Sequence, residues 1–292
     1  MRMVPGLIVL LFPVTAQAHE AGLSDGGLPN AFVVLPLLLA GGLYVAGVAR
    51  LWRQAGSGGG LSHFRAASFA AGLALSALML FSPIDAIAER LLSAHMIQHF
   101  GLMLVAAPLM VLGRPRIAVL WAVPQRGRPA LARLGQGATG RVWRTATHPF
   151  GAWLLYFAVL WAWHMPTLYQ LALGDDWVHA LQHMSFLGVA VLFCVAVLDL
   201  PRAEGRAGAF LAIFATALQS SALAALLTTA RTLWYPAYAS GAGEWNLSPL
   251  EDQQLAGLIM WVPCGAILIG AAIAVLAGIL RDTEVRAERV SS

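Results

Sequence analysis

One five-residue pattern, His-x-x-Gln-His, occurs twice in a chain that is 59% hydrophobic. The first copy occupies residues 95–99 (HMIQH) and the second occupies residues 179–183 (HALQH). On a helix, residues four positions apart lie on the same face, about 6 Å apart along the axis. Each copy can therefore direct two imidazoles toward one place. Imidazole suits copper, zinc, iron and nickel, so the pattern predicts a metal or haem site where the two copies meet.

The composition indicates which class of protein positions these histidines. Only 11% of the 292 residues are charged, against about 25% in soluble domains, and the mean hydropathy is +0.72. We therefore predict an all-α polytopic membrane protein, because lipid cannot satisfy the exposed backbone groups of other open structures. All 18 basic residues are arginine. A retinal-binding protein is thereby excluded, since the retinal Schiff base requires a lysine amine.

Residues 1–18 have the order of a cleavable secretory signal peptide. A basic residue, Arg2, is followed by a short apolar run and then by Ala16-Gln17-Ala18, a small-x-small cleavage pattern. The apolar run is too short to cross a hydrocarbon core of about 30 Å. The sequence thus predicts a signal peptide, a membrane domain over residues 19–281 and a cytoplasmic tail over residues 282–292.

Seven apolar segments after the signal are long enough to cross a membrane as helices. They are residues 31–50, 65–82, 86–112, 149–165, 177–198, 208–230 and 254–280. Arginines gather on one side of these segments, and by the positive-inside rule that side is cytoplasmic. Most of these arginines lie in residues 50–65, 114–144, 202–206 and 281–289. We therefore predict an outer N-terminus and a cytoplasmic C-terminus in a bacterial inner membrane.

The segment 114–144 is strongly basic and interspersed with apolar residues. It contains seven arginines and no acidic residue. Such a composition predicts amphipathic pieces that lie along the inner membrane surface against anionic lipid. Membrane lipid is thus an expected partner, and no nucleic-acid partner is expected.

This topology brings six of the eight histidines to the outer side, His19 among them. Met103 lies about one turn beyond His99, and thioether sulfur favours cuprous copper. Copper is therefore the favoured metal and zinc is the second choice. The predicted ligands are His95, His99, His179 and His183, with His164 and Met103 as further candidates. Behind them, Gln98 and Gln182 are expected to orient imidazoles, and Asp252 is a candidate for the same supporting layer.

Two local patterns describe how the outer helix ends are built. Ser248-Pro249-Leu250-Glu251 fits a capping box, Ser82-Pro83-Ile84-Asp85 is a weaker version of it, and Asp176 is expected to cap the fifth helix. In addition, Pro83 precedes the first histidine pattern much as Pro166 precedes the second. This weak internal repeat predicts that the second and third helices correspond to the fourth and fifth.

Four stretches in this order resemble the CtaG-type cytochrome c oxidase assembly factors, a family of seven-helix bacterial membrane proteins. They are HMIQH with APLMVLGRP (residues 95–115), WHMP with LY (163–169), HALQH with Phe186, and EDQQ leading to GLIMW (251–261). The likeness covers the chain from about Ser82 to Ile279. The chain departs from the family at Gln182, where glutamate is usual.

The resemblance implies a non-enzymatic role in maturing a haem–copper oxidase, through copper handled at the outer membrane face. It implies the oxidase subunits as partners, and a periplasmic copper carrier is a further candidate partner.

Two other functions are compatible with the residues. Histidines on different helices can ligate haem axially in a membrane cytochrome. A copper permease would need a polar path inward, which only the segment 208–230 offers, through Gln219, Ser220, Ser221, Thr228 and Thr229. No Ser-His-Asp order and no H-E-x-x-H pattern indicates a hydrolase, so we do not expect an enzyme.

Overall fold

The computed structural model describes residues 27–198 and 203–291, and within these ranges every regular element is a helix. The predicted all-α class is confirmed. The predicted signal peptide lies outside the described residues. The longer elements are α1 (Gly27–Ala55), α2 (His63–Phe81), α4 (Leu92–Phe100), α9 (Pro149–His164), α11 (Asp176–Leu198), α12 (Ala203–Thr228) and α13 (Pro249–Ser291). The shorter α-helices are α3 (Pro83–Ala88), α5 (Ala107–Leu112), α6 (Pro115–Ala122), α7 (Arg128–Leu134), α8 (Gly137–Ala146) and α10 (Pro166–Gly174). Gly101–Ala106 is a π-helical turn, and Gln125–Gly127, Pro236–Tyr238 and Ala242–Trp245 are 3₁₀ turns.

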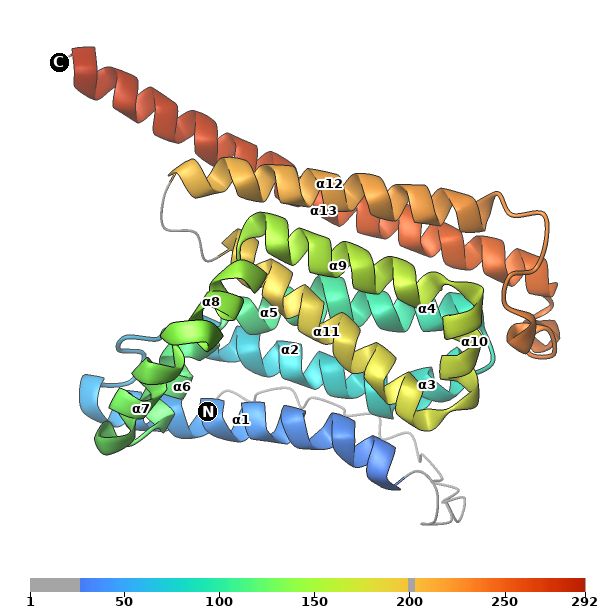
Figure 1. Ribbon diagram of the computed structural model, residues 1–292, viewed down its shortest axis with the longest axis horizontal. Helices are drawn as coiled ribbons and strands as arrows, with labels where there is room; N and C mark the ends of the chain where they lie inside the picture. The colour runs from blue at the N-terminus through green and yellow to red at the C-terminus, as the bar shows by residue number, and fades with distance from the viewer. Residues whose placement is uncertain (1–26, 199–202, 292) are drawn as a thin grey trace, which may run out of the picture.

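Six helices among the described residues are long and apolar enough to cross a membrane. They are Leu28–Ala55, His63–Phe81, Leu92–Leu112, Asp176–Leu198, Gly205–Thr228 and Pro249–Arg281. The predicted span at 149–165 forms α9, whose 16 residues extend about 24 Å, less than a hydrocarbon core of about 30 Å. α9 packs between α11 and α12 in the bundle (Figure 1). Because α9 is shorter than the hydrocarbon core, a seventh span stays a prediction.

The two ends of the helix bundle differ in chemistry (Figure 1). One end holds α3, α10 and the segment that joins α12 to α13, and α4 and α11 begin there with their histidine patterns. We call it the histidine end. The opposite end holds α6, α7 and α8, which carry the basic segment. We call it the arginine end.

The predicted internal repeat is present in the order of the helices. In α2–α3–α4, a long helix reaches the histidine end, a six-residue helix starts at Pro83, and the HMIQH helix follows. In α9–α10–α11, the same order recurs, with a nine-residue helix that starts at Pro166 before the HALQH helix. Because proline is favoured in the first helical turn and lacks an N–H to pair there, both short helices begin at an equivalent place. The repeat thus delivers both histidine patterns to one end.

α4 begins at Leu92 rather than at residue 86, where its predicted segment begins. Residues 83–88 form the separate helix α3, which Ser82 caps through a hydrogen bond from the Ile84 amide. Leu91, at the start of α4, has no side chain that can cap the helix. Hydrophobic periodicity could not reveal this break, because the group that starts α4 comes from another helix, α13.

That group is the carboxylate of Asp252. It accepts hydrogen bonds from the backbone N–H groups of Leu92 at 2.7 Å and Ser93 at 3.1 Å, and from the Ser93 hydroxyl at 2.5 Å. The side chain is fully buried. A helix leaves its first N–H groups without partners, and a carboxylate at that position also complements the helix dipole. Asp252 therefore fixes where the helix that carries His95 begins.

Two of the three predicted helix caps are confirmed. Ser82 caps α3, and Ser248 and Glu251 bond reciprocally to each other's backbone N–H as a capping box requires. The prediction for α11 is wrong by one residue. Asp175, not Asp176, accepts from the amides that follow, because Asp176 is already the first residue of the helix.

The π-helical turn directly follows His99 in the stretch that runs from α4 to α5. Pro108, in the next turn, has no N–H to donate and crowds the preceding turn. A wider turn accommodates both effects, and such turns are frequent at functional sites. Because the wider turn changes the angular spacing of residues, Met103 does not keep the α-helical relation to His99 on which its prediction as a cluster ligand was based.

Part of the basic segment packs into the bundle instead of only lying along a membrane surface. The Tyr44 hydroxyl of α1 donates to the Gly113 carbonyl at 2.8 Å. Ala118 of α6 is fully buried, and α6 lies so close to α1 that a Cβ at Gly47 would be 1.8 Å from the Ala118 oxygen. The exposed residues of α7 and α8 remain available for lipid.

α12 and α13 are in close contact at Gly257. A Cβ there would lie 2.4 Å from the Thr228 Oγ1 atom and 2.6 Å from the Thr228 nitrogen. We expect Gly257→Ala to lower the melting temperature in detergent, although the same change in a free helix raises stability by about 1 kcal/mol. Gly270→Ala, on the same helix with open space around it, is the control and should be neutral or stabilising. Equal melting temperatures for the two variants would contradict this packing.

Candidate metal centre

The two histidine patterns meet at the histidine end. His95, on α4, and His179 and His183, on α11, each offer a ring nitrogen, and these nitrogens all lie within 4.8 Å of one another. The ring centroids of His179 and His183 are 4.4 Å apart, and those of His95 and His183 are 5.6 Å apart. We call these three residues the histidine triad. Spacing within each pattern and the recurrence of α2–α3–α4 as α9–α10–α11 together explain why the rings converge.

His99 stands beside the triad. Its Nε2 atom is 2.9 Å from Nε2 of His95, and its ring lies against that of His183 at 5.3 Å. The ring also contacts Phe186, at 4.5 Å between centroids. His95, His99 and His183 are almost fully buried, whereas His179 is partly exposed. The triad is therefore reached from the side of His179.

A tyrosine fixes the orientation of His95. The Tyr238 hydroxyl donates to the Ala88 carbonyl at 3.2 Å and lies 3.0 Å from Nδ1 of His95. The His95 ring also has the Ala88 carbonyl as a hydrogen-bond partner, and a carbonyl only accepts, so Nδ1 of His95 carries the ring proton. Nε2 of His95 is then unprotonated, which is the form that binds metal. Burial raises the pKa of Tyr238, so the phenol keeps its proton.

Sequence reasoning did not identify this tyrosine. The chain has five tyrosines, and three of them, Tyr169, Tyr235 and Tyr238, surround the histidines. The Tyr169 ring is tilted against the His95 ring and the Tyr235 ring, with centroid distances of 5.4 Å and 4.3 Å. The one feature of the sequence that could have indicated it was the pair Tyr235 and Tyr238 in the connection between α12 and α13. That connection is distant in sequence from both histidine patterns, so spacing alone could not link them.

The expected supporting residues fall in three different places. Gln98 donates to the Met79 carbonyl and to the Asp85 carboxylate, so it braces α4 against α2 and α3 rather than bonding a histidine. The buried Gln182 amide lies near the His95 ring but makes no well-aligned hydrogen bond. Asp252 contacts the backbone of α4 and supports His95 through the helix.

Acidic side chains lie next to the triad. Asp85, on α3, is close enough to His179 for their charges to interact. Burial raises the pKa of Asp85, while the Gln98 hydrogen bond and His179 oppose the rise. Burial also raises the pKa of Glu89, and the neighbouring charges of Asp85 and Asp176 add to the effect. These acids give the entrance beside His179 a negative character that attracts cations.

The triad fits a metal ion. Nε2 of His179 and Nε2 of His183 are buried and have no hydrogen-bond partner, and an unpaired buried polar atom costs about 1–3 kcal/mol. Metal–imidazole bonds of about 2.0 Å place three nitrogens about 3.3–3.5 Å from one another, so binding requires the rings to close by up to about 1.5 Å from the present 4.8 Å limit. Three neutral nitrogens suit copper, zinc, nickel or iron.

His164 and Met103 do not join the triad. His164, at the end of α9, has ring contacts with Tyr169 and Phe186, at 6.3 and 6.2 Å. Together with Met103 and His99 it lines a separate small cavity of about 40 Å³. Neither His164 nor Met103, the two further ligand candidates, therefore belongs to the triad.

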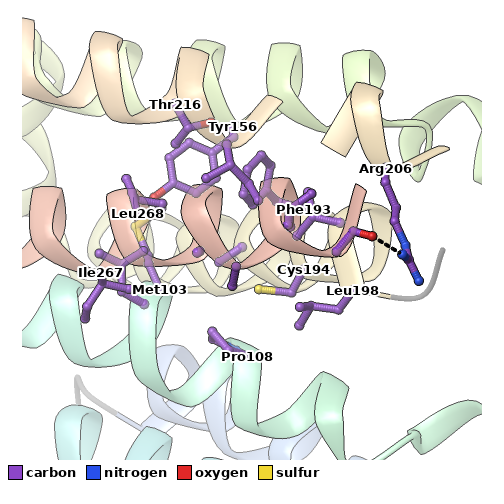
Figure 2. A pocket seen from close by; sticks show the side chains of 18 of the residues that line it. Met103, Pro108, Tyr156, Phe193, Cys194, Leu198, Arg206, Thr216, Ile267 and Leu268 are labelled. Carbon is purple, nitrogen blue, oxygen red and sulfur yellow. Dashed lines mark hydrogen bonds between the residues drawn. The ribbon is translucent and has the colours of Figure 1, made fainter. Parts of the chain in front are cut away.

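A larger cavity of about 700 Å³ continues from the small cavity toward the arginine end (Figure 2). The two cavities share Met103, Leu104, Tyr156 and Leu268. Most of its lining is apolar, and its far end holds Arg206, which donates to the Gly278 carbonyl at 3.1 Å, and Arg281. Arg206 and Arg281 are the charged residues of this lining.

These observations define a multi-helix protein with membrane-spanning character and a buried histidine centre at one end of its bundle. The chain belongs to the cytochrome c oxidase caa3 assembly factor family (Caa3_CtaG), whose model matches residues 42–282. The resemblance inferred from the four sequence stretches is thus confirmed.

Two curated mycobacterial proteins are similar to the chain. Both are described as uncharacterized, one from Mycobacterium bovis and one from Mycobacterium tuberculosis, and each is 29% identical over 228 residues. The match covers 75% of this chain but 34% of each relative. The chain therefore spans about a third of the length of these relatives. No solved structure matches the chain.

Proposed function

We propose that the protein binds copper at the histidine triad and serves the copper supply of a haem–copper cytochrome c oxidase. The observation that carries the proposal is the convergence of His95, His179 and His183, which come from two distant patterns, on one buried place. Membership of an oxidase assembly factor family supplies the biological role. The oxidase subunits are the expected partners, with a periplasmic copper carrier as a candidate donor.

The thioether sulfurs beside the triad, rather than its three nitrogens, favour copper over zinc. The triad contains no carboxylate, and in the described part of the chain no other group of three His, Cys, Asp or Glu residues converges in this way. Methionine sulfur lies close by at Met96 and Met103, which line the small cavity with His99. Nitrogen and thioether donors side by side are typical of sites that handle cuprous copper.

The triad faces the outer side in this proposal. The arginine end carries most of the basic residues, and the positive-inside rule places such loops in the cytoplasm. The histidine end is then the outer, periplasmic end, where acids beside His179 meet incoming metal. This orientation requires α9 to cross the membrane as the seventh span.

The structure favours copper binding over the two alternatives. For haem, a porphyrin would have to enter between two rings, but the rings of His95, His99 and His183 are in mutual contact at 4.3–5.6 Å. For a copper permease, the path inward would end at Arg206 and Arg281, and two cations there oppose the passage of a third.

Elemental analysis tests the proposal. The protein would be purified in detergent from metal-replete cells and assayed for copper, zinc and iron, beside a variant that lacks all four pattern histidines. His63→Ala, a change at the start of α2 at the arginine end, is the matched control. Near-stoichiometric copper in the wild type and the control, absent from the four-histidine variant, is expected. Iron instead of copper, or copper that the four-histidine variant retains, would overturn the proposal.

Removing the hydroxyl that orients His95 should weaken the triad. Tyr238→Phe removes the phenol oxygen beside Nδ1 of His95 and leaves the Ala88 carbonyl as its partner, and loss of a group that orients a metal ligand typically costs about 10–100-fold in affinity. Competition titration with a copper chelator would measure the loss. Tyr235→Phe, whose hydroxyl bonds the His164 carbonyl instead, is the control and should retain the affinity of the triad. Unchanged affinity in Tyr238→Phe would show that the phenol does not orient His95.

A further inference from the structure

The small cavity beside the triad contains an imidazole prepared for a ligand. Nδ1 of His164 lies 2.7 Å from the Leu160 carbonyl and donates its proton there. Nε2 is then unprotonated, and it is buried without any hydrogen-bond partner. A histidine that binds metal typically donates its other ring N–H to a backbone carbonyl. His164 has this arrangement, and the side chain is only 3% exposed.

The rest of the cavity is rich in sulfur. Met96, Met103, Met260 and Cys264 line it together with His99 and His164. None of the thioethers can donate a proton to Nε2 of His164. The Cys264 thiol is engaged with the Ile259 carbonyl at 3.7 Å. The hydroxyl-bearing residues Tyr156 and Ser220 also line the cavity, and neither forms a hydrogen bond to Nε2 of His164. The nitrogen is therefore open to a ligand in the cavity.

The size and charge of the cavity restrict that partner. A volume of about 40 Å³ has room for a bare ion or a few waters but not for an organic ligand, since one water needs about 10–15 Å³. The lining includes no carboxylate, so an ion would have to be held by neutral ligands. The cost of burying an ion rises with the square of its charge, which favours a monovalent cation. Nitrogen and thioether ligands select cuprous copper among such ions.

We infer that His164, Met103 and Met260 form a second copper(I) site, separate from the histidine triad. His99 lies between the two, with Nε2 toward His95 and Nδ1 buried without a partner. Copper can thus occupy the triad near the entrance and this sulfur-lined site deeper in the bundle. The inference rests on the proposed function for the identity of the metal, but the second site has its own ligands and its own test.

The test is anaerobic titration of the full-length protein in detergent with copper(I) buffered by bicinchoninate. The double variant His179→Ala, His183→Ala lacks the triad but keeps the small cavity. We expect wild type to bind about one more equivalent of copper(I) than this variant, which should keep the equivalent bound in the small cavity. X-ray absorption of copper in that double variant should show sulfur neighbours. Adding Met260→Leu or His164→Leu should abolish this equivalent. Leucine conserves the volume of methionine, so Met260→Leu is the variant expected to retain the fold.

Met184→Leu is the matched control, because Met184 follows His183 but does not line the cavity, and melting temperatures check the fold of each variant. If copper(I) in the triad-deleted protein has only nitrogen or oxygen neighbours, or if no copper(I) binds there, the second site is overturned while the proposed function stands. If the cavity variants lose an equivalent and the triad variants lose none, the second site stands and the triad fails.

Discussion

A His95→Ala, His183→Ala variant is expected to insert into the membrane at normal levels but to leave the oxidase without its full copper content. The double change removes one triad nitrogen from α4 and one from α11, so the remaining His179 cannot hold the ion alone. The fold should survive, because the lost groups make few hydrogen bonds and an unpaired buried nitrogen on His183 is removed. The measurements are copper content and activity of the oxidase purified from the same cells.

His63→Ala, His148→Ala is the matched control, since His63 is the first residue of α2 and His148 is the N-cap of α9, both at the arginine end. It should leave oxidase copper unchanged. Normal oxidase copper in the His95, His183 variant, at equal protein level, would show that the triad does not serve the oxidase. Low copper in both double variants would indicate a general effect of histidine loss.

Asp252→Ala is expected to cause the largest loss of stability of any single change in α13. It leaves the backbone N–H groups of Leu92 and Ser93 buried without partners, at about 1–3 kcal/mol each. The start of α4 should then unravel toward His95, so metal binding at the triad should fall with stability. Thermal melting in detergent and copper titration at a temperature well below the transition measure the two effects.

Asp252→Asn keeps one oxygen that can accept a hydrogen bond and should recover part of the stability. Asp176→Ala removes an exposed acid from the first turn of α11 that Asp175 already caps, and it serves as the control with little expected change. If Asp252→Ala melts like Asp176→Ala, the cap supplied by α13 is not what holds α4 in place.

The sequence by itself determined the class of protein and the elements of its site. Its apolar content and helical periodicity were enough for an all-helical membrane protein, and the repeated histidine pattern with its preceding proline was enough to bring α4 and α11 to one end. These features depend on residues close in sequence, such as Ser82 with Pro83 or His179 with His183. Local geometry is set by neighbouring residues, so the chain alone reveals it.

Only the tertiary structure decided which groups position the histidines and which candidate ligands lie outside the triad. Asp252 starts α4 from another helix, and Tyr238 orients His95 from a connection far along the chain. The π-helical turn after His99 and the position of α9 place Met103 and His164 in a cavity of their own. Each of these contacts joins residues that no spacing rule relates, because packing between helices brings them together.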